Sequence, residues 1–511
     1  MIRLLYVSSV SACFEHENDD IYFTKEFTAE IDGKEVYRGN TNVFSVFDLK
    51  TDTEYRMTVK PVGEIVEFRT KSETAALNAR DFGAVGDGVT EDTEAIQTAI
   101  NCTFEGGRVV IPEGTYLIAP IILKSGVTIE LKKGATLLGH TEVGKYRILP
   151  GEIKDETGHE VQISTWEGDP AVSHQPLIAA YGCRDIAIVG EGVIDGNAQN
   201  SVWWLNHKAR KEGRPRLVFL NACRNVTIHG ITGQNAASWQ FHPYFSEDVN
   251  FYNMSVFAPK VSPNTDGCDP ESCDRVNIIG CRFSVGDDCI AIKSGKLYMG
   301  RKYKRPANRH TIRNCLMEYG HGAVVLGSEM SGGVTNLTVN RCLFRQADRG
   351  LRIKTRRGRG KDAVIDGVTF EKIKMVDVLT PLVINMYYFC DPDGKTEYVW
   401  SRKRLPVDDG TPYLGKFTFR DMECEGVNVA CGYFDGLPEM PIKEVELENV
   451  SFKIAENAEA GLPAMMSFIA PCRKSGLYFD NVETVKLKNV TFEGVENEEI
   501  VTGNVKNYER E

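Results

Sequence analysis

The chain has 511 residues, enough to bury a large core and to form more than one domain. Hydrophobic residues make up 42% and charged residues 26%, and 47 glycines accompany many short Val/Ile runs, which is typical of a β-rich globular protein. The net charge of −11 excludes a general polyanion binder, so an anionic ligand needs a local basic patch. No apolar run reaches the ~18 residues that a membrane span requires, so we expect no membrane partner.

Residues 1–72 are predicted to form a separate small β-sandwich. The runs 2–7 and 55–59 alternate polar and apolar residues at the period of a strand, and Asp32-Gly33 between them is a hairpin turn signal. The stretch 49–55 resembles the corner of fibronectin type III modules, where a tyrosine hydroxyl pins two strands. A first strand is preferred over an atypical export signal at residues 1–13, because the apolar run there is broken and carries one basic residue.

The 14 cysteines are scattered, and no Cys-x-x-Cys pair occurs. This pattern favours reduced thiols that pack as small apolar side chains over disulfides or a metal site. Reduced thiols are typical of a cytoplasmic protein, which is our expectation; export through the atypical N-terminal signal is the alternative.

A glycine-rich stretch, 81–88, precedes a predicted amphipathic helix at 91–100 with Thr90 as its N-cap. The stretch lacks the Lys-Ser/Thr of a phosphate-binding loop. It resembles the opening of pectin-degrading right-handed β-helix proteins, in which a short helix covers the first coil.

An internal repeat of the form apolar-x-apolar-x-Gly/Asn runs through the rest of the chain. It begins at residues 186, 226, 249, 276, 337, 417, 445 and 485. Short strands that recur about every 20–30 residues, with no helices between them, indicate a parallel β-helix. We therefore predict an all-β protein, with a right-handed parallel β-helix at 73–511 behind the sandwich. Cys281, Cys315 and Cys342 share one register of the repeat and are expected to form an inward-facing ladder.

Longer steps in the repeat predict insertions on the solenoid. They fall at about 141–180, 196–216, 296–309 and 386–414. Several carry aromatic residues, and long loops on a rigid solenoid are where binding specificity usually arises.

Three carboxylates lie one coil apart in the centre of the chain. Asp266 lies in Asn264-Thr-Asp-Gly, and Asp287 and Asp288 of a Gly-Asp-Asp motif follow it after about one step of the repeat, which should place them side by side. Glycosidic cleavage needs one protonated and one ionised carboxyl, and crowding of like charges raises one pKa. A single such aspartate is more often a turn residue, and a Ca²⁺ site is a further alternative; three within one coil favour catalysis.

Basic residues follow the carboxylates. His321 lies in a Gly-His-Gly turn, and a run from Arg345 to Lys361 includes Arg352 and Lys354. Such a run is usually a solvated face or a nucleic-acid patch. In an acidic protein, and next to clustered carboxylates, binding of a polyuronate is the better interpretation, so we expect no nucleic-acid partner.

Together these four motifs resemble, in order, those of glycoside hydrolase family 28, the polygalacturonases, and the similarity covers most of residues 75–500. The resemblance implies hydrolysis of α-1,4-galacturonan with inversion and without a metal or other cofactor. It implies Asp287 as general acid, Asp266 and Asp288 as the residues that hold and activate water, and His321 as a residue that tunes the acid. Arg352 and Lys354 would bind a galacturonate carboxylate beside the scissile bond.

Further stretches resemble the bacterial exo-acting branch of this family. They contain His242 and Glu329, which are candidates to line the sugar site together with Asn264; a structural role for His242 and Glu329 is the alternative. We therefore expect an exo-polygalacturonase that acts on oligogalacturonides from the non-reducing end.

Endo-cleavage and action on rhamnogalacturonan are alternatives. The Arg352/Lys354 pair argues against rhamnogalacturonan, because two cations favour an acidic sugar beside the cleaved bond. A non-catalytic carbohydrate-binding β-helix would have no use for the clustered acids. A Ca²⁺-dependent lyase is the last alternative.

Overall fold

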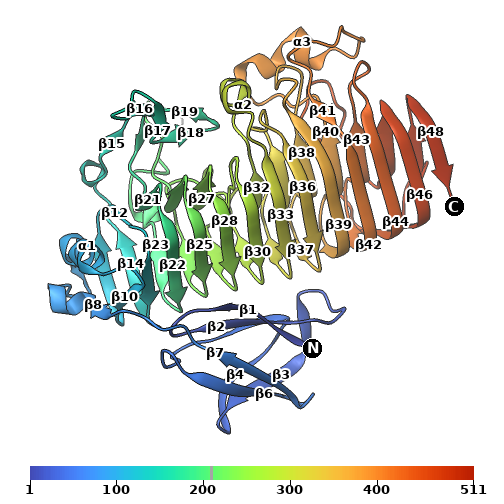
Figure 1. Ribbon diagram of the computed structural model, residues 1–511. Helices are drawn as coiled ribbons and strands as arrows, with labels where there is room; N and C mark the ends of the chain where they lie inside the picture. Colours follow the sequence, from blue (N-terminus) through green and yellow to red (C-terminus); the bar gives the residue numbers. More distant parts are fainter. Residues whose placement is uncertain (206, 208–210) are drawn as a thin grey trace.

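The computed structural model describes residues 1–205, 207 and 211–511, and it shows a parallel β-helix above two antiparallel sheets (Figure 1). The predicted all-β class is confirmed. Residues 206 and 208–210 of the predicted insertion at 196–216 lie outside the described residues. Among the residues that are described, no helix is both long and apolar enough to cross a membrane.

The front module is built from two antiparallel sheets. One has the order β1 (Ile2–Val7), β2 (Ala12–His16), β5 (Val43–Val46), and the other β4 (Lys34–Thr41), β3 (Phe23–Ile31), β6 (Glu54–Lys60), β7 (Glu64–Arg69). Phe14, Phe44 and Met57 are fully buried between them. The Tyr55 hydroxyl accepts a hydrogen bond from the Lys50 N–H at 2.7 Å, within the stretch 49–55.

The helix that opens the solenoid begins later than predicted. After β8 (Ala76–Asn78), η1 (Ala79–Phe82) and β9 (Asp87–Glu91), α1 runs over Thr93–Cys102. Thr90 is not its N-cap, because the Thr90 hydroxyl and N–H both donate to the Asp87 carboxylate within a turn. The residue before the helix, Asp92, instead accepts hydrogen bonds from the N–H groups of the glycine-rich stretch.

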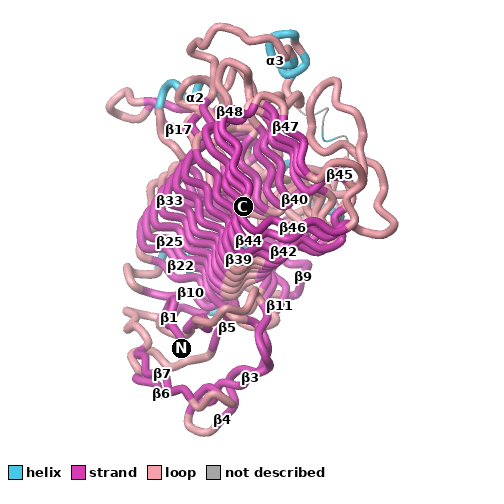
Figure 2. Tube along the Cα trace, turned by 90° about the vertical axis from the view of Figure 1, so that its right-hand side faces the viewer, coloured by secondary structure: helices cyan, strands magenta, loops and turns pink. Residues whose placement is uncertain are grey.

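Three ladders of parallel strands form the solenoid, which Figure 2 shows nearly end-on. The first contains β10 (Gly107–Ile111), β13 (Val127–Leu131), β22 (Arg184–Gly190), β25 (Arg224–His229), β28 (Glu247–Tyr252), β30 (Asp274–Ile279), β33 (Ala307–Arg313), β36 (Val334–Asn340), β39 (Val364–Val376), β42 (Lys416–Val427), β44 (Ile442–Ile454), β46 (Val482–Glu493) and β48 (Val505–Arg510). The second contains β11 (Gly114–Ile118), β14 (Ala135–Gly139), β23 (Val193–Asp195), β26 (Thr232–Gln234), β29 (Ser255–Phe257), β31 (Arg282–Ser284), β34 (Leu316–Glu318) and β37 (Leu343–Arg345). Every predicted repeat segment falls in the first ladder, so the repeat is confirmed.

The third ladder is interrupted. Its first part is β12 (Ile121–Ile122), β21 (Ile178–Tyr181), β24 (Val218–Asn221) and β27 (Phe241–Tyr244). Its second part is β32 (Ile290–Ile292), β35 (Val324–Gly327), β38 (Arg349–Lys354), β40 (Thr380–Asn385), β43 (Ala430–Asp435), β45 (Ser475–Asp480) and β47 (Ile500–Thr502). One coil between the two parts makes only isolated bridges, such as Phe241 to Cys268 and Cys268 to Ile290. We call this coil the seam.

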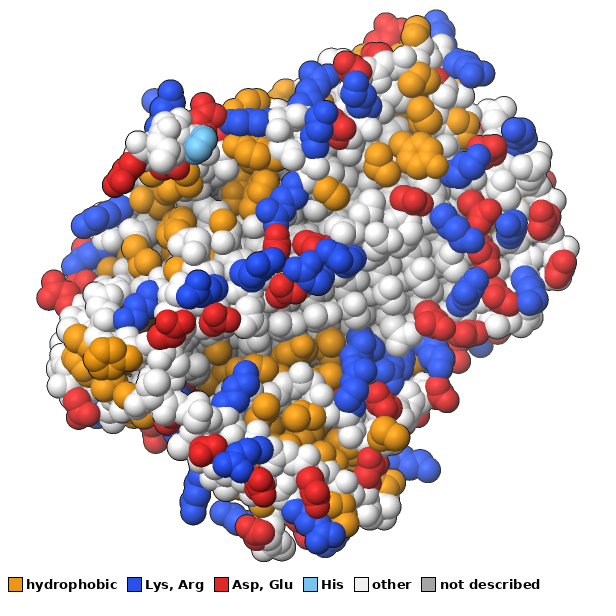
Figure 3. All heavy atoms as spheres, in the orientation of Figure 1, with side chains coloured by type: hydrophobic (Ala, Val, Ile, Leu, Met, Phe, Trp, Pro, Cys, Tyr) orange, Lys and Arg blue, Asp and Glu red, His pale blue; other side chains and the backbone are white. Residues whose placement is uncertain are grey.

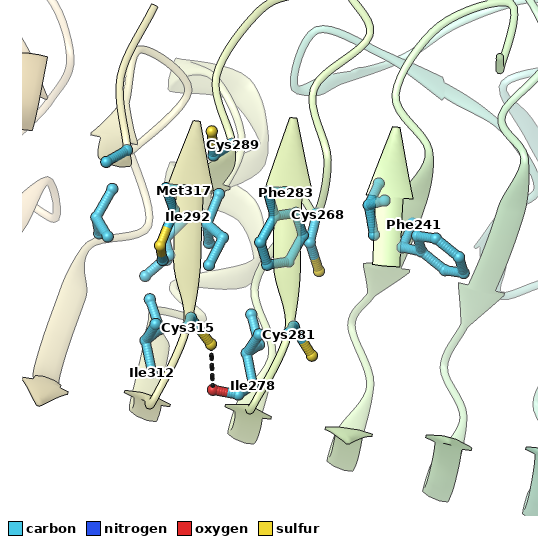
Figure 4. Packing of buried hydrophobic residues seen from close by; sticks show 14 of the residues in the cluster. Phe241, Cys268, Ile278, Cys281, Phe283, Cys289, Ile292, Ile312, Cys315 and Met317 are labelled. Carbon is cyan, nitrogen blue, oxygen red and sulfur yellow. Dashed lines mark hydrogen bonds between the residues drawn. The ribbon is translucent and has the colours of Figure 1, made fainter. Parts of the chain in front are cut away.

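The core runs the length of the solenoid, and the predicted cysteine ladder is part of it. Cys281, Cys315 and Cys342 have no exposed surface (Figure 4 labels the first two). The Cys315 thiol donates to the Ile278 carbonyl at 3.3 Å, drawn as a dashed line in Figure 4. All 14 cysteines of the chain are described, and each is a free thiol.

The predicted insertions form loops at the edge opposite the front module (Figures 1 and 2). They contain η2 (Val143–Lys145), β15 (Ile148–Leu149), β16 (Glu152–Lys154), β17 (Glu160–Gln162), β18 (Thr165–Trp166), β19 (Asp169–Pro170), β20 (Ser173–His174), η3 (Ala198–Asn200), α2 (Leu297–Tyr303), η5 (Pro392–Lys395), α3 (Glu397–Trp400) and β41 (Tyr413–Leu414). The hairpins of residues 148–174 rise on the N-terminal side of the seam, and α3 rises on its C-terminal side (Figure 1). The seam therefore lies between two sets of loops.

The front module is joined to the solenoid by a buried polar contact. Glu15 has no exposed surface; its carboxylate accepts hydrogen bonds from Arg313 at 2.7 and 2.9 Å, from Asn314 at 2.7 Å and from Arg341 at 3.1 Å. Arg3 of the module adds a fourth donor residue at 2.9 Å. Elsewhere on the face drawn in Figure 3, basic and acidic side chains are interspersed over module and solenoid.

Candidate active site

The seam brings the three predicted aspartates together. The bridge between Cys268 and Ile290 pairs positions one coil apart, so Asp266 lies opposite Asp288, and the Gly267 N–H donates to the Asp288 carbonyl at 3.0 Å. One carboxyl oxygen from each of Asp266, Asp287 and Asp288 lies within 4.8 Å of the others. The prediction that these residues are neighbours through the repeat is confirmed.

The three carboxyls differ in exposure. Asp266 is 3% and Asp288 1% exposed, whereas Asp287 is half-buried. Asp287 and Asn264 border a cavity of about 680 Å³ on the N-terminal side of the seam. Asp287 is therefore the member of the triad that reaches a space large enough for a sugar.

Two cations hold Asp288 in its ionised form. Lys354 Nζ lies 2.7 Å from one of its oxygens and Arg352 Nη1 lies 3.2 Å from the other. Burial alone would raise the pKa of Asp288, but these two cations lower it to about 2. Arg352 and Lys354 are thus at the site as predicted, with Asp288 as their partner.

Asp266 has the opposite electrostatic environment. Burial, and then the charges of Asp269 and Asp287, raise its pKa well above the ordinary value. The neutral form of Asp266 is therefore favoured relative to that of an exposed aspartate. Crowding by neighbouring carboxylates, which the sequence predicts, adds to the effect of burial on Asp266. The resemblance gives the acid role to the more exposed Asp287.

His321 lies beside the more exposed carboxyl. Its Nδ1 is 3.3 Å from Asp287 Oδ1, and the backbone N–H of His321 donates to the Asp287 backbone carbonyl at 3.0 Å. The hydrogen bond with Asp287 raises the pKa of His321. The imidazole can therefore carry a positive charge next to the triad at slightly acidic pH.

The other three residues predicted to contact the sugar differ in their exposure and in their distance from the cavity. Asn264 borders the cavity, and its Oδ1 accepts a hydrogen bond from Arg214 at 2.6 Å. Glu329 is 6% exposed and accepts from Lys293 at 3.0 Å. His242 has no exposed surface, and its Nε2 lies 3.0 Å from Glu271, so its position favours the structural alternative over a sugar contact.

Most of the basic run is engaged within the protein. Arg356 pairs with Asp391 and Asp393, Arg357 with Glu439, Arg359 with Asp391, and Lys361 with Asp409. The partners of Arg356, Arg359 and Lys361 lie in the loop of residues 386–414, and Glu439 lies beyond it, so none of them is near the run in sequence. Of this run, we therefore keep only Arg352 and Lys354 as candidates for binding a polyuronate.

Sequence reasoning missed several residues around the site. Trp166 and Arg214 border the cavity, Asp269 adjoins Asp266, and Lys293 lies 3.6 Å from Asp269. The sequence could have indicated two of them. Asp269 closely follows Asp266 in the chain, and Lys293 directly follows the short apolar run that comes after Asp288. Nothing in the sequence places Trp166, because its position depends on how an insertion folds.

The carboxylate cluster has ligand atoms of the kind that hard cations prefer. Both oxygens of Asp288, however, already accept from Lys354 or Arg352. The residues present therefore fit a site in which fixed side-chain cations provide the positive charge.

The parallel β-helix carries clustered carboxylates and fixed cations beside a cavity, which are the groups that an enzyme acting on glycosidic bonds requires. Residues 108–400 match the profile of glycosyl hydrolases family 28, and the chain belongs to that family.

Three relatives illustrate the range of the family. A probable polygalacturonase of Vitis vinifera is 31% identical over 392 residues, 74% of each chain. An endo-polygalacturonase of Pectobacterium carotovorum subsp. carotovorum is 30% identical over 315 residues, 58% of this chain and 72% of the relative. The crystal structure of a hyperthermoactive exopolygalacturonase from Thermotoga maritima superposes with a TM-score of 0.65 at 26% identity and covers 83% of this chain and 93% of that one.

Proposed function

We propose that the protein is an exo-acting polygalacturonase that removes galacturonate units from the non-reducing end of oligogalacturonides. The observation that carries the proposal is the triad itself: one carboxylate kept ionised by two cations, and a second carboxyl, Asp287, open to a cavity. Hydrolysis of a glycosidic bond needs both a proton donor and an ionised carboxylate. The two cations also provide the positive charge that an acidic sugar requires beside the scissile bond.

The loops on both sides of the seam support exo over endo action. The hairpins of residues 148–174 contribute Trp166, Ala171 and Val172 to the wall of the cavity. On the C-terminal side, Arg352 contacts Met465, and the Met465 carbonyl accepts a hydrogen bond from Asn385 at 2.9 Å. A cavity closed by these hairpins on the N-terminal side, with Met465 against Arg352 on the other side of the triad, suits a chain end better than the middle of a polymer.

We also propose inversion of the anomeric centre, on the ground of family membership. The nearest oxygens of the triad lie within 4.8 Å, closer than the ~6.5–9.5 Å that is usual for an inverting pair and near the ~5–5.5 Å of retaining pairs. Proton NMR of a digest in its first minutes identifies the anomer formed. A β-anomer from the α-linked substrate supports inversion, and an α-anomer overturns it.

The cleavage mode is tested by digestion of tri- to hexagalacturonate and of polygalacturonate, with products followed over time. We expect one short product from the earliest samples, without intermediate oligomers. A spread of oligomers would show endo action. Turnover of rhamnogalacturonan, with no turnover of any galacturonide, would overturn the substrate assignment, and absorbance near 235 nm in the products would indicate a lyase.

We propose that the front module is of the fibronectin type III kind. The support is its sheet order, three strands against four, and the Tyr55 hydroxyl contact to the Lys50 N–H. A structure search with residues 1–72 alone tests this, and a match only to other sandwich classes would contradict it.

We further propose that the protein works in a reducing compartment, the cytoplasm, on imported oligomers. The support is the set of free thiols, most of them buried. Fractionation of the source cells, with enzyme activity followed in each fraction, is the test; activity confined to the secreted fraction would contradict the proposal.

A further inference from the structure

Two tryptophans and two cations alternate in one stack next to the triad. The Arg216 guanidinium carbon lies 4.7 Å from the ring centre of Trp166 and 4.2 Å from that of Trp239. Lys293 Nζ lies 4.4 Å from the Trp239 ring centre. A cation over an aromatic face is attracted to it, and the attraction is strongest when both groups are shielded from water.

The inner end of this stack is Lys293, which forms ion pairs with buried carboxylates next to the triad. Lys293 is 3% exposed, and its ammonium group lies 3.0 Å from Glu329 and 3.6 Å from Asp269. Arg216 is 5% exposed and donates to the Ser238 hydroxyl at 2.7 Å. Burial lowers the pKa of Arg216 to about 10, which still leaves it charged at neutral pH. The stack is therefore a fixed part of the protein.

The outer end is the partly exposed Trp166, and the Arg214 guanidinium carbon also lies over this ring, 5.5 Å from the ring centre. Its indole borders the same cavity of about 680 Å³ as Asn264 and Asp287. Arg216 donates to the carbonyl of the preceding residue, Thr165, at 3.3 Å. A Cβ atom on Gly213 would come within 2.7 Å of the Trp166 ring, so the absence of a side chain at that position lets the backbone pack against the indole.

We propose that Trp166 is the surface on which a sugar ring stacks in this cavity, next to the bond that is cleaved. The inference rests on the proposed function and adds a specificity residue to it. A pyranose presents a face of C–H groups that packs on an indole, and the flat ring loses little conformational freedom when it binds. The cation behind the ring offsets the negative charge of the aromatic face, which suits a sugar that carries a carboxylate.

The kinetic test compares Trp166→Leu, which keeps apolar bulk without a flat face, with Trp166→Tyr, which keeps the face. With trigalacturonate we expect KM to rise about 10-fold in the leucine variant, with little change in kcat, and to stay within about 3-fold of wild type in the tyrosine variant. Phe104→Ala is the matched control, because Phe104 is an aromatic residue that is 75% exposed and does not line the cavity; KM should be unchanged in this variant.

An unchanged KM in Trp166→Leu, or equal losses in the leucine and tyrosine variants, overturns the inference. Absence of turnover in the wild-type enzyme would instead overturn the proposed function, so the two failures are distinguishable.

A binding measurement tests the same inference without the leucine variant, in case that variant folds poorly. Trigalacturonate is titrated into Asp287→Asn while indole fluorescence is recorded, and the titration is repeated with Asp287→Asn combined with Trp166→Tyr. We expect a fluorescence change that the second substitution abolishes. The same change in both proteins would show that the sugar does not contact Trp166.

Discussion

The buried carboxylate of Glu15 should contribute strongly to the stability of the docked front module. Glu15→Gln keeps the shape of the side chain and removes its charge. Arg313 and Arg341 would then face a neutral amide in a site where Glu15 has no exposed surface. Removal of one partner from a buried ion pair costs about 3–5 kcal/mol, and the retained amide oxygen places this substitution near the lower end, about 3 kcal/mol.

Urea-induced unfolding at pH 7 measures the effect, with Glu17→Gln as the control. Glu17 lies 3.6 Å from Arg3 and its side chain is 38% exposed, so its loss should cost no more than about 0.5 kcal/mol. Equal effects of the two substitutions would refute the argument that burial makes the Glu15 contact strong.

The same contact gives a pH dependence with a definite sign. Burial would raise the pKa of Glu15, but the hydrogen bond and charge of Arg313, with Arg341 and Arg3, lower it overall. A carboxyl with a lowered pKa in the folded state stabilises the fold above its unfolded pKa of about 4.3, and this contribution is lost as the pH falls through the folded value. The difference in stability between wild type and Glu15→Gln should therefore shrink in acid; a difference that grows would contradict the assignment.

Three further predictions concern the triad. Asp287→Asn should lower kcat by about 10²–10⁴-fold while calorimetry still detects trigalacturonate binding; loss of folding would show a structural residue instead. Lys354→Met leaves Asp288 with one cation, so its pKa should rise from about 2 and the acidic limb of the kcat/KM profile should move to higher pH; an unmoved limb would show that Asp288 need not be ionised. His321→Gln removes the imidazole whose pKa is raised by Asp287, so a limb caused by loss of its proton, which occurs above pH 6.5 in the wild type, should disappear from the profile; an identical profile would exclude His321 from the pH response.

The sequence predicts those parts of the site that depend on the period of the repeat. Asp266 and Asp288 are expected together because one step of the repeat separates them, and the strand bridges confirm that this step is one coil. The repeat alone cannot distinguish a residue that lines the cavity from one that is buried below it. His242 lies in a strand of the solenoid, but its side chain is buried and packs against Phe219 and Trp239.

Contacts made by insertions could not be predicted from the sequence, because they join segments with no common period. Arg357 and Glu439 are 82 residues apart, and Trp166 meets Arg216 across a long stretch of chain that the repeat does not describe. The run of like charges therefore predicted a binding surface, whereas Arg356, Arg357, Arg359 and Lys361 form ion pairs within the protein.

The seam has a consequence for how this family can change its size. Each coil contacts mainly its two neighbours, so the distances within the site depend on the coils from about residue 240 to 354. Whole coils added at the C-terminal end would lengthen the molecule by about 4.8 Å each and leave the triad in place, whereas loss of the coil that contains Met465 would remove a contact of Arg352. A deletion of even a single residue within the seam would instead shift Asp266 out of line with Asp288. The solenoid thus tolerates change in its length and very little in its register.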